Sequence, residues 1–486
     1  MKNKKMLLSL GLAFFMLFSG CAGEAENAEG SDTDKALTEQ PVQTVYTEAT
    51  APTEITSAAE STSGSAASSL TEGQTSDTGL NSEEASATVT VEKQTAAATN
   101  APKPVSTTTS ATAAKVTTVT TVTTASTTEE KAPPARGEYS DKLTTAQIVN
   151  NMGVGINLGN TFEACGDWIN KSGGVKAYET AWGSPVITED MIKGYAKCGF
   201  GVLRIPVAWS NLMGENYTIS SELMDRIKQV AKWTVDSGMY AIVNIHWDGG
   251  WWERFPNDKE NCMKKYTRVW EQISEGFKDF DGRVMFESLN EEGGWGSLWD
   301  RYSNQGDKQA SYNLLNEINQ RFVNIVRSSG GKNKIRHLLI AGYNTDIDLT
   351  CDKLFKMPDD PQNRCALSVH YYTPSTFCIL EKDESWGKAK TTWGSESDKK
   401  ELAKYMDMIK TNYVDKGIPV IIGEYGVATK NKSPEVVRLF LSSVAKAARD
   451  RSVCPVLWDT PNNFYNRNKC KFNDEELLKG IIAALN

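Results

Sequence analysis

The segment Val284-Met-Phe-Glu-Ser-Leu-Asn-Glu-Glu292 begins with apolar residues and ends in acidic ones. A short apolar run of this kind is typical of a strand buried in a parallel sheet, and Glu291 would lie at its carboxyl end. Far along the chain, Pro419-Val-Ile-Ile-Gly-Glu-Tyr-Gly426 has the same design and carries Glu424. Because the carboxyl ends of parallel strands meet at one edge of a sheet, we expect the two acids to lie close together.

Outward from these two segments, apolar runs and amphipathic segments alternate through residues 138–486. We expect strands at 153–160, 201–207, 240–246, 283–290, 337–343, 366–372, 420–424 and 455–458. We expect helices at 187–200, 220–238, 264–279, 312–328, near Lys353, and at 399–415, 434–450 and 475–485. Eight such units in roughly 350 residues predict a (β/α)8 barrel, or TIM barrel, of the α/β class. A doubly wound sheet usually has a glycine-rich phosphate loop after its first strand, and this sequence has none there.

The N-terminal segment has the pattern of an export signal. Residues 1–20 carry three lysines and then an apolar run, which predicts a signal peptide too short to span a bilayer stably. The sequence Leu17-Phe-Ser-Gly-Cys21 resembles a bacterial lipobox, although Phe18 stands where Leu is usual. We therefore expect lipidation of Cys21 and an extracytoplasmic protein anchored at the cell surface, with a freely secreted protein as the alternative.

Residues 21–137 are rich in Ser, Thr, Ala and Glu and show no apolar periodicity, which predicts a disordered tether. A coil of that length would have a root-mean-square span on the order of 60 Å or more. Residues 21–136 carry sixteen acidic and six basic side chains, a charge of −10, and residues 1–20 carry +3, so only −1 of the net charge of −8 belongs to the rest of the chain. The remainder of the chain is close to neutral, so no nucleic-acid partner is expected.

The cysteines and histidines do not predict a metal centre. The chain has only three His, and no C-x-x-C spacing occurs, so we expect no zinc cluster and no other cofactor. We expect buried free thiols at apolar positions such as Cys198, Cys365 and Cys454. An exported chain could instead form disulfides, but the sequence does not assign their pairing.

Chemically active side chains gather where the predicted strands end. Those positions hold Asn157, Arg204, His246, Asn290, Glu291, His370, Tyr372, Glu424 and Trp458. In a barrel these ends line one face, where catalytic residues are placed. His337 begins a strand instead, so we expect it to be structural or solvated.

Two carboxyl groups facing one another fit hydrolysis of a glycosidic bond, provided that one is neutral and the other ionised. We expect Arg204 to keep Glu424 ionised as the nucleophile, with a strand-end salt bridge as the alternative role for Arg204. Glu291 would act first as general acid and then as general base. Two strand-terminal glutamates could also be merely solvated, which is the alternative for each acid taken alone.

The remaining polar residues receive supporting roles. Asn290 could bind the sugar 2-hydroxyl, and Tyr372 could donate to the nucleophile. His246 and His370 could orient the site and bind hydroxyl groups.

Tryptophans at strand ends or in predicted loops are candidates to stack on sugar rings, with core packing as the alternative for each. We expect stacking by Trp182, Trp247, Trp251, Trp252, Trp295 and Trp458, with Asn157 binding hydroxyl groups. The pair Trp251-Trp252 follows Asp248-Gly-Gly and is expected at the surface. Trp209, Trp233 and Trp270 are expected to pack in the core or on helix faces.

Eight short motifs follow one another after about Tyr139: Asn157-Leu-Gly-Asn160, Tyr178-Glu-Thr-Ala-Trp-Gly183, Arg204-Ile-Pro, Asn244-Ile-His-Trp, Leu289-Asn-Glu291, Val369-His-Tyr-Tyr-Thr-Pro374, Gly423-Glu-Tyr-Gly426 and Trp458-Asp. Together they resemble glycoside hydrolase family 5, most closely its subfamily 4 of endoglucanases and related β-glucanases. The resemblance implies a retaining barrel enzyme that needs no metal and cleaves plant cell-wall β-glucans. It also implies Glu291 as acid/base and Glu424 as nucleophile.

One position departs from that resemblance. Many members have Pro after the acid/base, and this sequence has Glu292, a second carboxyl that could raise the pKa of the acid.

The expected function is therefore a monomeric endo-β-1,4-glucanase acting on a β-glucan polysaccharide. A xyloglucanase, xylanase or mannanase is an alternative within the same family, because the backbone preference depends on loop shapes. A catalytically silent glycan-binding surface lipoprotein is an alternative of another class, and the presence of both glutamates argues against it.

Overall fold

The computed structural model describes residues 138–486. The predicted signal peptide (1–20), the tether (21–137) and the lipidation site Cys21 lie outside the described residues and stay predictions. None of the helices within residues 138–486 combines the length and the apolar character needed to cross a membrane.

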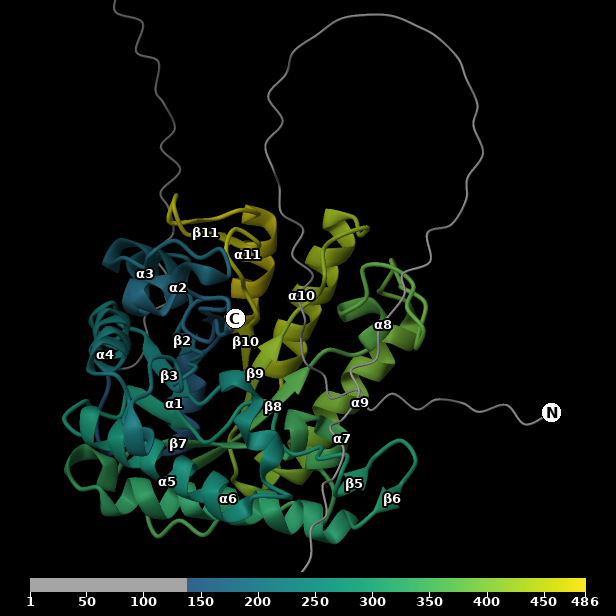
Figure 1. The fold of residues 1–486 in the computed structure, drawn as a ribbon. Coiled ribbons are helices and arrows are strands. Elements are labelled where there is room, and N and C mark those ends of the chain that lie inside the picture. Colours follow the sequence, from purple (N-terminus) through teal and green to yellow (C-terminus); the bar gives the residue numbers. More distant parts are fainter. Residues whose placement is uncertain (1–137) are drawn as a thin grey trace, which may run out of the picture. The chain divides into compact units, whose positions relative to one another are not determined.

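Eight parallel strands form a closed barrel, as predicted (Figure 1). Around the barrel they run in the order β1, β2, β3, β4, β7, β8, β9, β10, and β10 pairs with β1 to close it. Their bounds are β1 Gly155–Asn157, β2 Val202–Ile205, β3 Tyr240–Asn244, β4 Val284–Glu287, β7 Leu338–Ala341, β8 Cys365–Tyr371, β9 Val420–Tyr425 and β10 Cys454–Leu457. Every predicted strand is present, so the (β/α)8 prediction is confirmed.

Helices surround this sheet (Figure 1). Their bounds are α1 Thr145–Met152, α2 Gly174–Ala181, α3 Glu189–Lys197, α4 Ser221–Asp236, α5 Lys259–Gly276, α6 Lys308–Ser328, α7 Ile347–Thr350, α8 Ser375–Cys378, α9 Glu396–Asn412, α10 Pro434–Arg449 and α11 Glu475–Ile482. Short 3-10 turns lie at Lys171–Gly173 (η1), Glu215–Tyr217 (η2), Asp248–Arg254 (η3), Gly331–Lys334 (η4), Tyr343–Thr345 (η5), Val414–Lys416 (η6) and Ala483–Leu485 (η7).

The sequence explains the helix boundaries locally. Thr188 caps α3 by accepting from the Met191 amide. Ser433 caps α10 in the same way, and Pro434 occupies the first turn, where its missing N–H costs nothing. The buried face of α10 has the spacing of a helix packed on a sheet, with Val437, Phe440, Leu441 and Val444 inside.

Side chains alternate along the strands between the helices and the barrel interior. One apolar cluster fills the interior and includes Val202, Ile242 and Met285. Two residues further along the same faces, the side chains become polar: Arg204 follows Val202, and Glu287 follows Met285. The barrel is therefore apolar at one end and polar at the end where its strands finish.

The apolar end is closed by α1, which the sequence analysis missed. Ile148, Val149 and Met152 belong to the same interior cluster as the strand residues. Other unpredicted elements are α2, α8 and two hairpins, β5 (Trp299–Asp300) with β6 (Gln305–Gly306) and β11 (Tyr465–Asn466) with β12 (Lys471–Phe472). The short helix expected near Lys353 lies slightly earlier, as α7.

Strand β9 contains a bulge at Gly423. Ile422 pairs with Val369 of β8, and the next pair joins Glu424 to His370, so Gly423 is an extra residue. Ile422 packs on the outer side of the barrel, and strict alternation would turn Glu424 outward as well. The bulge turns Glu424 into the polar end of the barrel instead.

We expect Gly423→Ala to lower the free energy of unfolding by about 1–2 kcal/mol, because overpacking a closed site has such a cost. A Cβ at this position would lie 3.0 Å from Ser368 Oγ and 3.1 Å from His370 Nε2. Ser368 cannot yield freely, since its hydroxyl is bonded to Glu287. Urea denaturation would measure the change. Gly296→Ala, at a position with open space, is the control, and equal stability of the two variants would contradict the prediction.

Candidate active site

The guanidinium of Arg204 lies at the centre of the polar end of the barrel. Arg204 is fully buried and donates from Nε to Glu287 (2.7 Å) and from Nη1 to Glu424 (2.8 Å). It also donates to the side-chain oxygens of Asn157 (3.1 Å) and Asn290 (2.8 Å). One side chain of β2 therefore joins β1, β9, β4 and the turn after β4.

Charge balance at Arg204 depends on a residue that the sequence analysis did not select. Glu287 is fully buried, and its second oxygen accepts from Ser368 Oγ at 2.7 Å. Burial by itself would lower the pKa of Arg204, but the carboxylates of Glu287 and Glu424 outweigh burial and raise it. The sequence did contain a signal for this role. Glu287 is a charged residue within an apolar strand, and a charge buried there needs a partner of opposite charge.

Asn157 lies behind the site and not in contact with solvent. Its side chain is fully buried and donates to the Gly423 carbonyl at 2.9 Å while accepting from Arg204. The predicted contact between Asn157 and substrate is therefore corrected: this residue positions Arg204 and the bulge of β9.

The two acids predicted to meet do lie close together. Ligand atoms of Glu291, His370 and Glu424 all lie within 4.8 Å of one another. His370 Nδ1 is 2.7 Å from Glu291 Oε1 and 3.8 Å from Glu424 Oε2. The same spacing would admit a divalent cation. For two carboxyl groups this spacing is close to the roughly 5–5.5 Å of a double displacement and well short of the roughly 6.5–9.5 Å that inversion requires.

The two acids have different surroundings. The Glu424 side chain is only 6% exposed and is held by Arg204, whereas the Glu291 side chain is 23% exposed and faces His370. Burial raises the pKa of Glu424 above its usual 4.5, against the opposing effects of His370 and Arg204. Arg204 thus contacts Glu424 as expected, but burial outweighs its effect on the pKa.

Neutral hydrogen-bonding groups complete the polar end. Tyr372 Oη donates to Glu424 Oε2 at 3.0 Å. Burial, followed by the nearby carboxylates, raises the pKa of Tyr372 well above 10, so the phenol keeps its proton. Burial, followed by Arg204 and His370, lowers the pKa of His246 well below 6.5, so that imidazole is neutral.

Three of the candidate tryptophans remain partly exposed. The Trp458 ring stacks on His246 with centroids 5.8 Å apart and planes 5° apart, which fixes the orientation of the indole. Trp247 is half-buried and meets Trp252 edge-on, and Trp182 ends α2 with its side chain half-buried. These three keep the predicted capacity to stack on a sugar.

Trp251, Trp252 and Trp295 pack in the core, so their predicted stacking role is wrong. Their exposed fractions are 8%, 8% and 4%. Asp248 accepts from the Trp251 indole at 2.7 Å, and the Trp252 carbonyl accepts from the Trp295 indole at 3.1 Å. The loop after β3 folds back on α5, and this path buries rings that local sequence suggested were exposed.

The residues predicted to be structural are so placed. His337 is fully buried and contacts Thr145 Oγ1, and burial lowers its pKa to about 3. Trp209 and Trp270 are fully buried. In residues 138–486 all eight cysteines are free; Cys454 is buried as expected, whereas Cys198 and Cys365 are only half-buried.

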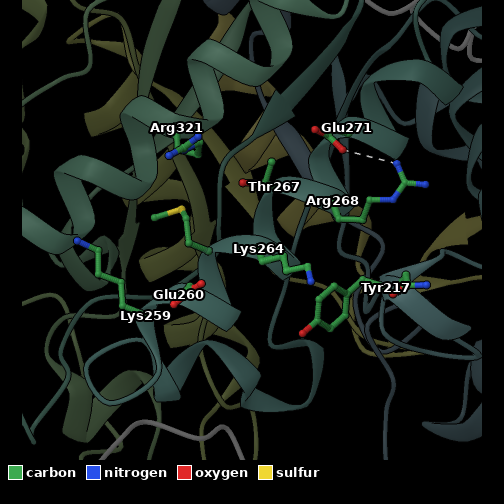
Figure 2. A pocket seen from close by; sticks show the side chains of 10 residues that line it. Tyr217, Lys259, Glu260, Lys264, Thr267, Arg268, Glu271 and Arg321 are labelled. Carbon is green, nitrogen blue, oxygen red and sulfur yellow. Dashed lines mark ion pairs between the residues drawn. The ribbon is translucent and has the colours of Figure 1, made fainter. Parts of the chain in front are cut away.

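A separate hollow of about 750 Å³ lies on the outside of the barrel, lined by residues of η2, α5 and α6 (Figure 2). Figure 2 shows Arg268 paired with Glu271 there, at 3.6 Å. Its acids, Glu260 and Glu271, are eleven residues apart on one helix, or roughly 16 Å. They cannot act on one bond, and the hollow contains none of the predicted site residues.

Known proteins share this architecture. The family model for cellulase (glycosyl hydrolase family 5) matches residues 163–464. The xyloglucan-specific endo-beta-1,4-glucanase BoGH5A of Bacteroides ovatus is 33% identical over 368 residues, covering 71% of this chain and 71% of that protein. Endoglucanase A of Paenibacillus barcinonensis is 34% identical over 380 residues, covering 71% of this chain and 90% of that protein.

A solved structure, the GH5-4 broad specificity endoglucanase from an uncultured bovine rumen ciliate, superposes with a TM-score of 0.64 at 35% identity. The match covers 71% of this chain and 98% of that one. The family match spans more than half of the chain and coincides with the barrel that carries the paired acids. The chain therefore belongs to glycosyl hydrolase family 5.

Proposed function

We propose that this enzyme is a retaining endo-β-1,4-glucanase in which Glu424 is the nucleophile and Glu291 is the acid/base. The observation that carries the proposal is the pair of acids within 4.8 Å, one tied to a buried cation and the other facing the more open side. The names of the relatives support the same reaction and the same substrate class.

In the first step Glu424 attacks the anomeric carbon, and the bond to the leaving sugar breaks. Glu291 gives its proton to the departing glycosidic oxygen, so the products are a glycosyl ester on Glu424 and a free sugar hydroxyl. Arg204 and Tyr372 hold the Glu424 carboxylate in place for the attack. Asn290, anchored through its oxygen by Arg204, donates its amide hydrogens to the sugar 2-hydroxyl.

In the second step water enters where the leaving group was. Glu291, now ionised, takes a proton from the water, whose oxygen attacks the anomeric carbon and releases Glu424. Two inversions give net retention of the β configuration.

Proton NMR of the first-formed reducing sugar should show the β anomer, and an initial α anomer would refute the double displacement.

The backbone preference rests on groups beyond the paired acids. A xyloglucanase is the second candidate, because one relative is named xyloglucan-specific and a solved neighbour is a xyloglucanase in complex with a heptasaccharide. We expect carboxymethylcellulose and mixed-linkage glucan to be cleaved internally, with rapid loss of viscosity. Higher kcat/KM on xyloglucan than on either would favour the second candidate, and activity confined to xylan or mannan would exclude both.

We further propose that the enzyme is a monomeric lipoprotein, exported by residues 1–20 and anchored outside the cytoplasm through Cys21. The lipobox-like sequence Leu17-Phe-Ser-Gly-Cys21 supports this assignment. A Cys21→Ser variant should be released from the membrane fraction, and its retention there would contradict the anchor.

Replacing each acid by alanine should separate the two roles. We expect both variants to lose activity on glucan by about 10²–10⁴-fold or more, the size of an acid/base contribution. With 2,4-dinitrophenyl β-cellobioside, azide should rescue Glu291→Ala and give the β-glycosyl azide, because azide replaces water on the glycosyl enzyme. Azide should rescue Glu424→Ala by giving the α-glycosyl azide, because it replaces the nucleophile. Glu253→Ala, at an exposed acid, is the control. If the two variants gave azides of the opposite configurations, Glu291 would be the nucleophile and Glu424 the acid/base.

The acidic limb of the pH profile should report Glu424. This group must be ionised to attack, and burial raises its pKa, so kcat/KM should fall on acidification at a higher pH than an exposed glutamate would give. Tyr372→Phe removes a donor to the carboxylate and should shift the limb to still higher pH. Tyr302→Phe, at an exposed site, is the control, and an unshifted limb in Tyr372→Phe would contradict the assignment.

A further inference from the structure

The backbone that carries Glu291 is held by a residue from another loop. Asn344, in the turn η5 after β7, donates from Nδ2 to the Glu291 carbonyl at 2.7 Å. Its own amide donates to the Glu292 carbonyl at 2.6 Å. Asn344 has a φ of 52°, a conformation that Asn adopts more readily than most residues.

The Glu292 side chain holds the same segment from within. One oxygen accepts from the Asn290 amide, while the other has no hydrogen-bond partner among the described residues. The residue is fully buried, so it does not touch substrate. Burial, with smaller contributions from Glu291 and Glu287, raises the pKa of Glu292 well above 4.5 and outweighs the opposing amide hydrogen bonds. Burial thus favours the neutral form of this carboxyl, which accepts the hydrogen bond without placing a second negative charge beside Glu291.

Two glycines allow the close approach of these parts. Gly293 and Gly294 have φ angles of 91° and 66°. A Cβ on Gly293 would lie 3.1 Å from the Asn344 amide nitrogen, and a Cβ on Gly294 would lie 3.0 Å from Asn344 Oδ1. The turn after Glu292 is therefore shaped around Asn344.

We propose that Glu292 and Asn344 form a brace that positions the acid/base Glu291 for proton transfer to the leaving oxygen. This inference rests on the proposed function and deepens it. Glu292 and Asn344 are positioning residues, because they act through the peptide groups of residues 290–292. Glu424 lies on β9, outside the brace, and is fixed separately by Arg204 and Tyr372.

A series of aryl β-cellobiosides tests the brace. Proton donation matters for a poor leaving group such as phenol and little for 2,4-dinitrophenol, which leaves as the anion. We expect Glu292→Leu to lower kcat/KM for the phenyl substrate by about tenfold or more and for the dinitrophenyl substrate by less than about threefold. Glu292→Gln is the matched control: its neutral amide oxygen can still accept from Asn290, so kcat/KM should stay near wild type on both substrates.

Asn344→Gly is a second and independent variant, since glycine adopts the same backbone conformation but has no side-chain donor. It should show the same selective loss of kcat/KM for the phenyl substrate, and it tests the brace even where Glu292→Leu does not fold. Equal losses on both substrates in a folded variant would mean a merely structural role and would overturn the proposal. If Glu291→Gln itself lacked the leaving-group dependence, the acid/base assignment would fail instead, so the two failures are distinguishable.

Discussion

The structure depends above all on one buried cation. Removing a guanidinium from water has a large cost unless counter-charges and hydrogen-bond acceptors surround it. Arg204 meets both needs, with Glu287 and Glu424 as counter-charges and with Asn157 and Asn290 as further acceptors. Because these partners come from different strands, satisfying Arg204 also assembles the polar end of the barrel. The planar guanidinium also fixes the directions of these hydrogen bonds, which the ammonium group of a lysine would not do.

The same arrangement makes two chemically equal acids different. Glu424 shares the charge of Arg204 and lies almost out of solvent, while Glu291 faces His370 at a more open position. Different surroundings give like groups different roles, which is the basis of acid and nucleophile assignments in paired-carboxyl sites. Glu287 is a second, fully buried counter-charge for Arg204. The guanidinium therefore keeps one carboxylate partner when Glu424 loses its charge during the reaction.

The burial of the aromatic side chains could not be predicted from the sequence. Trp458 and Trp251 both occur near strand ends, yet one ring lies partly exposed on His246 and the other is buried beside Asp248. Composition cannot separate the two, because the burial of a ring depends on how a loop returns to the barrel. The helix α1 was missed although its start carries a local signal, since Thr144 and Gln147 form a capping box.

The sequence by itself determined the eight strands and the polar residues at their ends, because alternating apolar and amphipathic runs are local properties of the chain. It also indicated the family, through short motifs that can be compared without coordinates. Only the tertiary structure decided which way these residues point. The bulge at Gly423 turns Glu424 inward against strict alternation, and Glu287 and Asn344 act on segments distant in sequence. Such effects arise from pairing between strands and from closure of the barrel, which no single stretch of sequence contains.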